Sequence, residues 1–318
     1  MRVTDRLYGS HEIDEPVLVD LINSQPLQRL KGIAQFGVPD NYYHLKNYSR
    51  YEHSIGVLLL LRSLGAGLNE QIAGLLHDVS HTAFSHVYDW IIKESGGAEE
   101  AQDDHHTWYF KHSDLPPILK RHGIPPEEVS DCHSFTLLEL SAPDICADRV
   151  DYALREMPVD VAQRCLTGLI AERGKVIFNN SATALVFADQ YLDLQISHWG
   201  GLESTNRYYY LGQAMRRALK IGCLAPHDFW QDDDFVMNKV QACGDKEIDR
   251  ILSGLQIKNW SGLPHGDLKM NKKFRHVDPL CRSGEGIVKL SEINSEFKHR
   301  LEKERQINSQ GLPIVIIP

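Results

Sequence analysis

Residues 75 to 89 read Leu75-Leu76-His77-Asp78-Val79-Ser80-His81-Thr82-Ala83-Phe84-Ser85-His86-Val87-Tyr88-Asp89. Three histidines and two aspartates lie here inside an otherwise apolar, helix-like pattern. His77 and His81 are four residues apart, which places both imidazoles on one face if the segment is helical. Such groups enter an apolar interior only when something pairs with them, and a bound metal with hydrogen-bonded neighbours is the usual partner. The segment therefore predicts a metal site in a helical protein.

Two further polar positions belong with this segment. His53 lies in Arg50-Tyr51-Glu52-His53-Ser54-Ile55-Gly56-Val57, and Asp148 lies in Ala147-Asp148-Arg149-Val150-Asp151-Tyr152. The series His…His-Asp…Asp on successive helices resembles the HD-domain metal-dependent phosphohydrolases. The resemblance implies that His53, His77, Asp78 and Asp148 bind one metal ion.

The resemblance extends from residue 5 to about residue 155. Gln28-Arg29-Leu30 and Gln35-Phe36-Gly37 are similar to the segment that precedes the first metal histidine in the deoxynucleotide triphosphohydrolase branch of that family. After Met157 the similarity is loose. We therefore expect a nucleotide-directed enzyme, with the allosteric features of that branch not located.

The type of metal follows from the donor atoms. Neutral imidazoles and carboxylates suit a divalent transition metal (Mn, Fe, Zn, Co or Ni), and open coordination positions remain for water and a phosphate oxygen. No cysteine is in the group, which argues against a structural zinc site. Mg²⁺ could also arrive with the substrate.

A second tier of polar residues is expected to move protons. It consists of His81, His86, Asp89 and His106, since family members carry additional histidines and a nearby aspartate after the His-Asp pair. His106 is preferred over His105 because the family often has a His-Glu pair there, although Thr107 stands in the Glu position. An imidazole oriented by a carboxylate is a suitable general acid or base.

Five residues are predicted to contact the substrate. Arg50 lies one helical turn before His53 and has a phosphate-binding role in the family, which suits the guanidinium fork. Arg149 and Tyr152 belong to the family's Asp-(Lys/Arg)-x-Asp-Tyr motif, Gln35 to the upstream similarity, and Arg207 opens a basic, tyrosine-rich helix.

Composition narrows the possible partners. The formal net charge of −9 argues against non-specific binding of nucleic acid or an anionic membrane, but local cations can still bind a small phosphorylated substrate. The six cysteines form no CxxC pair and fit a reducing cytosol better than a disulfide framework. Without an apolar amino-terminal or membrane-spanning segment, the chain is expected to be cytoplasmic, and a homo-oligomer is left open.

The predicted fold class is mainly α. Residues 1–222 are expected to form an HD-domain helical catalytic core, and residues 223–318 a small α+β carboxy-terminal appendage. Within the core, a turn is predicted at Ser95-Gly96-Gly97. A β-hairpin is predicted from Lys175–Phe178 and Ala184–Phe187, with its turn at Asn179-Asn180-Ser181. Leu312–Ile317 is predicted to be an apolar strand that needs a partner.

Three functions fit these observations. The first is a metal-dependent phosphohydrolase acting on a nucleotide, with a deoxynucleoside triphosphate as the first guess. The second is a phosphatase or phosphodiesterase acting on another small phosphorylated metabolite. The third is a catalytically silent module that senses a nucleotide, but the presence of His81, His86 and Asp89 argues against it.

Overall fold

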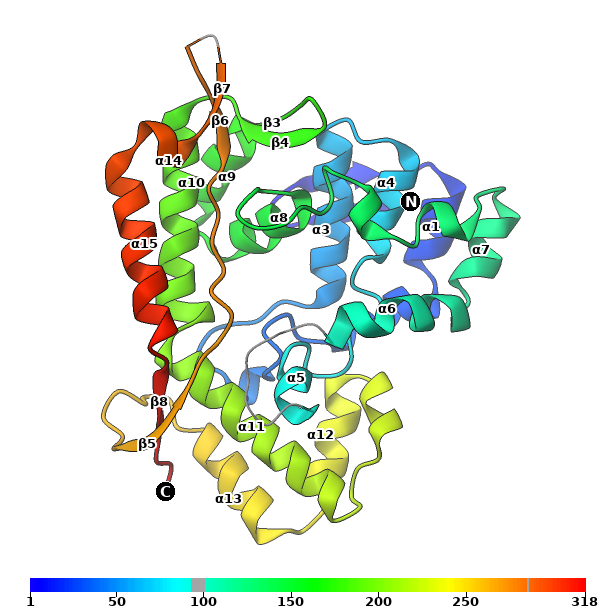
Figure 1. The fold of residues 1–318 in the computed structure, drawn as a ribbon. Coiled ribbons are helices and arrows are strands. Elements are labelled where there is room, and N and C mark those ends of the chain that lie inside the picture. Colours follow the sequence, from blue (N-terminus) through cyan, green and yellow to red (C-terminus); the bar gives the residue numbers. More distant parts are fainter. Residues whose placement is uncertain (93–100, 285) are drawn as a thin grey trace.

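A computed structural model describes residues 1–92, 101–284 and 286–318 of the chain (Figure 1). The helices are α1 (Pro16–Ile22), α2 (Gln25–Arg29), α3 (Arg50–Ser63), α4 (Leu68–Leu76), α5 (Val87–Ile92), α6 (Ala101–His112), α7 (Leu115–Arg121), α8 (Ala147–Glu156), α9 (Val159–Gly168), α10 (Ser181–Leu194), α11 (Leu202–Lys220), α12 (Asp233–Gln241), α13 (Lys246–Leu255), α14 (Leu290–Ile293) and α15 (Ser295–Ser309). The strands are β1 (Arg2–Asp5), β2 (Gly9–Glu12), β3 (Leu169–Glu172), β4 (Lys175–Phe178), β5 (His265–Met270), β6 (Leu280–Ser283), β7 (Gly286–Lys289) and β8 (Leu312–Val315). The predicted mainly α class is confirmed; the turn predicted at 95–97 lies outside the described residues.

Helix α3 is the central helix of the metal-binding half. Its start is set locally by a capping box, in which Ser49 accepts from the Glu52 amide and the Glu52 carboxylate accepts from the Ser49 amide. A run of buried apolar residues from Ile55 to Leu61 then packs the helix against α4 and α8. Burial on nearly all sides explains why α3 lacks a polar face, as expected for a helix inside a bundle.

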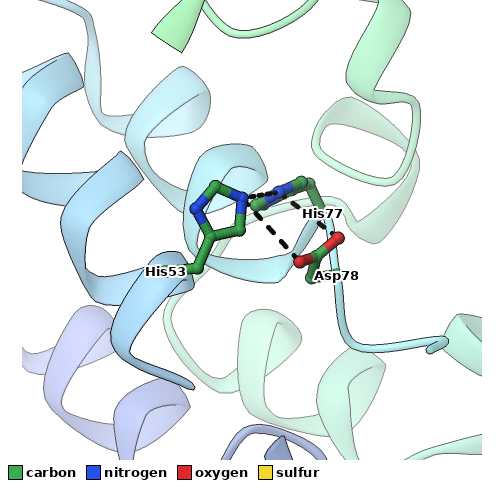
Figure 2. Close-up of side chains that lie close together, drawn as sticks. All are labelled: His53, His77 and Asp78. Carbon is green, nitrogen blue, oxygen red and sulfur yellow. Dashed lines mark hydrogen bonds and ion pairs between the residues drawn. The ribbon is translucent and has the colours of Figure 1, made fainter. Parts of the chain in front are cut away.

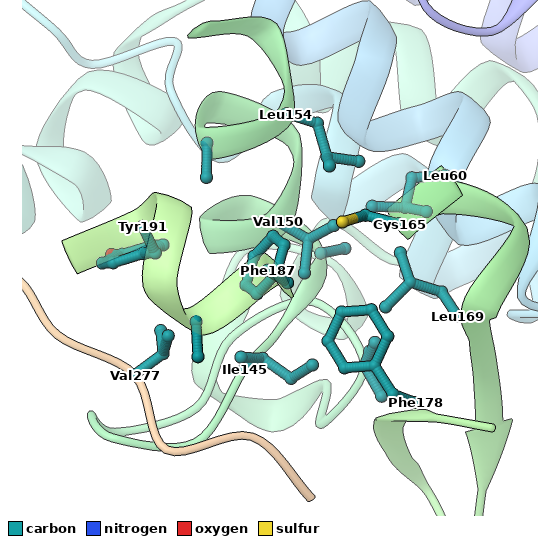
Figure 3. Packing of buried hydrophobic residues seen from close by; sticks show 14 of the residues in the cluster. Leu60, Ile145, Val150, Leu154, Cys165, Leu169, Phe178, Phe187, Tyr191 and Val277 are labelled. Atoms are coloured by element: carbon teal, nitrogen blue, oxygen red, sulfur yellow. The ribbon is translucent and has the colours of Figure 1, made fainter. Parts of the chain in front are cut away.

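Three apolar clusters hold the bundle together. One joins α3 to α8, α9 and α10 and contains Val150, Phe178 and Phe187 (Figure 3). A second surrounds α11, α12 and α13, and a third lies under α1, α2 and α4. Val277 and Phe297 belong to the first cluster, so segments after residue 222 pack against the helices that precede it. The division at residue 222 stays a prediction.

The sheets are small and lie at the edges. The β1–β2 and β5–β8 pairs are antiparallel, and β3-β4-β6-β7 forms a four-stranded sheet in which β4 and β6 are parallel. The partner that the closing apolar strand requires is β5, since His265 pairs with Val315. The β4–β6 pairing attaches the carboxy-terminal part to the core, with Phe178 opposite Cys281.

The predicted hairpin is wrong in its second strand. The strand β4 pairs with the preceding strand β3 through a turn at Arg173 and Gly174, both with positive φ. Asn180, which the sequence placed in a hairpin turn, instead caps α10 by accepting from the Thr183 amide. Ala184 and Phe187 are therefore helical, because an asparagine N-cap initiates a helix as readily as asparagine occupies a turn.

The helix expected to carry His81, His86 and Asp89 is also interrupted. Helix α4 ends at Leu76, the chain then turns, and α5 begins only at Val87. Phe84 and Ser85 have φ of 64° and 46°, which no helix accommodates. Only Asp89 of the three is therefore helical.

The expectation of no disulfide framework is corrected at one position. Cys223 and Cys243 form a disulfide, which ties the end of α11 to the end of α12. Within the described residues, Cys132, Cys146, Cys165 and Cys281 take part in no disulfide. Among the described residues, no helix combines the length and apolar character that crossing a membrane requires.

Candidate metal centre and its cavity

The four predicted metal ligands lie close to one another, with Asp148 beside the rings of His53 and His77. His53 lies in the first turn of α3, His77 and Asp78 follow directly after α4, and Asp148 lies in the first turn of α8 (Figures 1 and 2). The contacts between α3 and both α4 and α8 bring these helix ends together. His53, His77 and Asp78 are all buried.

The donor atoms of His53, His77 and Asp78 all lie within 4.8 Å of one another, close enough to share a single ion, whereas Asp148 contacts both rings but is grouped at that distance with Glu139 and Cys146. The Nε2 atoms of His53 and His77 are 3.2 Å apart, and His53 Nε2 is 2.9 Å from Asp148 Oδ1. His77 Nε2 lies 3.4 Å from Asp78 Oδ1 and 3.5 Å from Asp148 Oδ1. Figure 2 shows the two rings and the Asp78 carboxylate turned toward one another.

The hydrogen bonds on the other side of the two rings indicate a cation here. His77 Nδ1 is 2.7 Å from the Gly74 carbonyl, and His53 Nδ1 is 2.7 Å from Asp151 Oδ2. A carbonyl and a carboxylate only accept, so each Nδ1 carries a proton. The Nε2 lone pairs of neutral rings then face each other and two carboxylates, and a divalent cation removes this repulsion. The residues fit a metal ion.

The electrostatics favour positive charge at this point, carried either by a metal ion or by a proton on His77 Nε2. Burial lowers the pKa of the His77 imidazole, but the carboxylates of Asp78 and Asp148 outweigh burial and raise this pKa to about 9. Burial raises the pKa of the Asp148 carboxyl, and the His53 and His77 rings reverse the effect and hold the pKa far below its usual range. Both shifts express the same demand for positive charge between the carboxylates.

Asp151 is a buried support that the sequence analysis did not assign. Its carboxylate accepts from His53, from Arg155 Nε at 2.7 Å and from the Tyr8 hydroxyl at 2.8 Å. Gly56 makes this approach to α3 possible, because a Cβ there would lie 2.0 Å from Arg155 Nη2 and 2.1 Å from Asp151 Oδ1. Asp151 lies one helical turn after Asp148 in Asp148-Arg149-Val150-Asp151, and this spacing is the signal that could have identified Asp151 as a support for the site.

The predicted proton-transfer histidines lie beside the metal cluster. His81 Nε2 is 3.3 Å from Asp78 Oδ1, and the His81 ring meets the His86 ring edge to face at 5.1 Å. Burial, and secondarily Arg50, lowers the pKa of His81 well below its usual value. His86 Nδ1 lies 3.7 Å from Asp89 Oδ2, beyond hydrogen-bond length.

His105 and His106 point to different places. His106 lines the main cavity together with His81 and His86, and its Nδ1 lies 3.1 Å from Ser80 Oγ. Burial lowers the pKa of His106 to about 4. His105 packs near the rings of Trp230 and Tyr88. The geometry therefore fits the preference for His106, whose role stays a prediction.

A cavity of about 630 Å³ opens from the metal cluster. Gln35, Arg149 and Tyr152 line it, as the sequence analysis expected of substrate contacts. Gln35 Oε1 is buried and has no hydrogen-bond partner within the described parts of the chain. Such an atom is costly unless a ligand or a water donates to it.

The three arginines predicted to contact the substrate donate to other groups of the protein in this structure. Arg50, also in the wall, donates to Asp78 Oδ2 at 2.6 Å and to Ser85 Oγ at 2.8 Å, and Arg149 donates to Glu139 Oε1 at 2.9 Å. Arg207 is not in the cavity wall. Its guanidinium donates to the carbonyls of Leu255 and Ile257, so in this structure it joins α11 to the end of α13.

The carboxy-terminal part supplies cavity residues that the sequence analysis missed. Lys272, Lys273, Phe274, Arg275 and His276 all line the cavity, although they follow the predicted boundary at residue 222. The signal that could have identified them is a short run of basic and aromatic side chains in the sequence. Glu156 and His198, which pair with each other, also lie in the wall.

The chain matches one protein-family model and is similar in sequence to several known proteins. A model described as the HD domain matches residues 50–152. The chain is 36% identical to the uncharacterized protein YdhJ of Bacillus subtilis over 100% of this chain and 99% of that protein. It is 31% identical to the metal-dependent phosphohydrolase cns2 of Cordyceps militaris over 87% of this chain and 84% of that protein.

More distant similarities agree with the fold. The human deoxynucleoside triphosphate triphosphohydrolase SAMHD1 is 29% identical over 40% of this chain, which spans 23% of that protein. The resemblance to the triphosphohydrolase branch is therefore partial. A phosphohydrolase structure from Bacteroides thetaiotaomicron superposes with a TM-score of 0.65 at 16% identity, covering 92% of this chain and 94% of that one.

Proposed function

The chain belongs to the HD-domain family of metal-dependent phosphohydrolases, and from this premise we propose that its substrate is a nucleotide, with a deoxynucleoside triphosphate as the first candidate. One observation carries the proposal. The cavity of about 630 Å³ lies within the range of pockets that bind whole small molecules, and a single phosphate group would fill only part of it.

The walls of this cavity suit the organic part of such a substrate. Phe36, Tyr43 and Tyr48 line it together with the metal cluster. The Phe36 ring packs 5.5 Å from Tyr43 and 5.4 Å from Tyr48. Aromatic faces offer stacking area for a planar ring, and polar groups such as Gln35 Oε1 can be satisfied by hydroxyl or amino groups.

We assign roles to the residues as follows. His53, His77, Asp78 and Asp148 would hold the divalent cation. That cation supplies Lewis acidity and lowers the pKa of a bound water to about 7 in favourable cases. Arg50 keeps Asp78 in place through its 2.6 Å hydrogen bond. Asp151 and the Gly74 carbonyl fix the tautomers of His53 and His77, so that both Nε2 atoms present lone pairs.

Proton transfer is proposed for the histidines beside the cluster. His81, His86 and His106 share the cavity wall, and Asp89 faces Nδ1 of His86. With Nδ1 turned to the carboxylate, the opposite nitrogen of His86 can exchange a proton with the reacting phosphate or its leaving group. Catalytic hydrogen bonds are often long in a protein without substrate, so the 3.7 Å separation is compatible with this role.

A second candidate is a phosphatase or phosphodiesterase for another small phosphorylated metabolite. The engagement of Arg50 with Asp78 and of Arg149 with Glu139 favours it, as does the position of Arg207 outside the cavity. These arginines were the expected partners of a triphosphate chain. A substrate with a single phosphate would not need them.

One experiment separates the two candidates. The purified protein is analysed for its metal and then incubated with a panel of nucleoside mono-, di- and triphosphates and with a simple phosphomonoester. Release of triphosphate or phosphate from nucleotides supports the proposal. Turnover of the phosphomonoester with none of any nucleotide would reject it and support the second candidate.

A further inference from the structure

We propose that the segment Lys272–His276, here called the cationic wall, binds an additional phosphate group of a polyphosphorylated substrate, beyond the phosphate that reacts at the metal centre. This inference rests on the proposed function, because it names the part of the substrate that the rest of the cavity would hold. Nothing in the similarity to the family's motifs points to this segment, which lies more than a hundred residues after Asp148.

The cationic wall is an extended segment outside any sheet. It lies between β5 and β6, and Figure 1 draws this connection in orange alongside α10 and α15. Two amide side chains hold its backbone: Asn308 Nδ2 donates to the Lys272 carbonyl at 3.2 Å, and Gln195 Oε1 accepts from the Arg275 amide at 3.1 Å. At roughly 3.3 Å per residue, the five residues extend about 13 Å along the cavity.

The two ends of the cationic wall reach different parts of the cavity. At one end, the Lys272 ammonium donates to Ser204 Oγ at 2.9 Å and lies 3.3 Å from the centre of the Tyr208 ring. At the other end, Arg275 lies near Tyr191 and Tyr152. Burial raises the pKa of the Tyr191 hydroxyl, and the positive charge of Arg275 is among the influences that oppose this rise. The wall thus runs from the aromatic side of the cavity toward the metal side.

The cationic wall adds three basic side chains to the lining of the cavity. Arg50 and Arg149 also line it, and they donate to Asp78 and Glu139. Lys272, Lys273 and Arg275 occupy three of four consecutive positions and line the same cavity from one backbone segment.

A phosphate chain suits this arrangement for two reasons. Lysine and arginine are the side chains that bind phosphate oxygens, as a point charge and as a fork. A polyphosphate also carries several charges along an extended length, which matches cations spread along an extended segment. A monophosphate held at the metal would leave the wall without a ligand group.

The test uses an exposed residue, so that the variant folds. Lys273 is exposed and lines the cavity, whereas Lys269 is equally exposed but lies in β5 outside the cavity. Inhibition by inorganic tripolyphosphate and by orthophosphate is measured at constant free metal, with whichever nucleotide or phosphomonoester the purified protein hydrolyses as the reporter substrate. In Lys273→Gln, the inhibition constant for tripolyphosphate should rise roughly 10-fold, the scale of one charged hydrogen bond, while that for orthophosphate is unchanged.

Two controls complete the test. Lys269→Gln should behave as the wild type, and Lys273→Arg should restore most of the tripolyphosphate inhibition. Three results would overturn the inference. The inhibition constants for tripolyphosphate and orthophosphate could change equally, or the constant for tripolyphosphate could rise as much in Lys269→Gln as in Lys273→Gln. The third result is no change in this constant in either Lys273→Gln or Lys273→Gln/Arg275→Gln. Because any hydrolysed nucleotide or phosphomonoester can serve as the reporter substrate, the cationic wall is tested separately from the identity of the substrate.

Discussion

The two sides of the cavity are built in opposite ways. On the metal side, His53, His77 and Asp148 come from helix ends, and the far nitrogen of each ring is held by a hydrogen bond. On the other side, Lys272–His276 is an extended segment held by the amides of Gln195 and Asn308. Rigid helices suit a site that must present donor atoms to one ion. Long cationic side chains on an extended backbone suit a variable, charged part of a substrate.

The largest effect is expected from loss of a metal ligand. His77→Ala or Asp148→Ala should remove the metal and abolish hydrolysis, while the fold survives because the ligands come from separate helices. The loss of affinity should exceed the roughly 10- to 100-fold expected when only a supporting residue changes. Elemental analysis and circular dichroism check this; a stoichiometric metal in both variants would contradict the four-ligand assignment.

A smaller effect is expected from loss of a predicted proton-transfer residue beside the metal ligands. His81→Ala and Asp89→Ala should retain about one metal per chain but lower turnover roughly 10²- to 10⁴-fold, the usual contribution of general acid–base catalysis. Metal content and kcat are measured on the same preparations. If either variant lost its metal, the distinction between ligands and proton-transfer residues would be wrong.

Loss of the hydrogen bond between Asp151 and His53 should have a still smaller effect. Asp151→Asn keeps the size of the side chain but removes the charge that accepts from His53 Nδ1, so metal affinity should fall roughly 10- to 100-fold. The matched control is Asp160→Asn, since Asp160 is exposed at the start of α9. Retention of metal against increasing chelator measures the difference, and identical curves for the two variants would argue that Asp151 serves only the packing of Arg155.

The smallest effect concerns the link between the metal side and the carboxy-terminal part. Asp233 Oδ1 accepts from the Phe84 amide at 2.7 Å, and Oδ2 accepts from the Ala34 amide at 2.9 Å. Burial raises the pKa of this carboxyl from 3.8 to about 7. Between these values the folded state keeps a proton that the unfolded state releases, so this group's contribution to stability falls as pH rises through that window.

The corresponding measurement is urea unfolding of the wild type and of Asp233→Asn at about pH 5 and about pH 8. The wild type should lose more stability than the variant between the two conditions, because an asparagine does not titrate. Equal losses would show that Asp233 does not carry the shifted pKa. Metal content should be the same in the wild type and in Asp233→Asn, since Asp233 accepts from backbone amides and is not one of the predicted metal ligands.

Much of the metal side was predictable because its signals are local. Ser49 and Glu52 form a capping box that starts α3, and Asp232 and Asp245 likewise cap α12 and α13 through side chains within one turn. The order His53, His77-Asp78, Asp148 predicted a ligand set, and the structure brings these residues close together. A cap depends on residues within one turn, and a ligand motif depends on residue type and spacing.

Local signals failed where two structures compete for the same residues. Asn180 suits a turn as well as an N-cap, and the helical alternative won because α10 buries Phe187 against the core. The helix expected at His81 is interrupted at Phe84 and Ser85, and the Phe84 amide donates to Asp233, which lies 149 residues away in the sequence. No pattern within the segment itself announces a partner at that distance.

By itself, the sequence determined the mainly helical class and the family and predicted the metal-ligand series, because periodicity, caps and motif spacing are properties of neighbouring residues. Only the tertiary structure decided that Arg207 joins α11 to α13, that Cys223 bridges Cys243, and that Lys272–His276 lines the cavity. These outcomes depend on which elements pack together and on the direction in which each side chain then points. Such contacts arise from the burial of apolar surface across the whole chain, which local sequence does not encode.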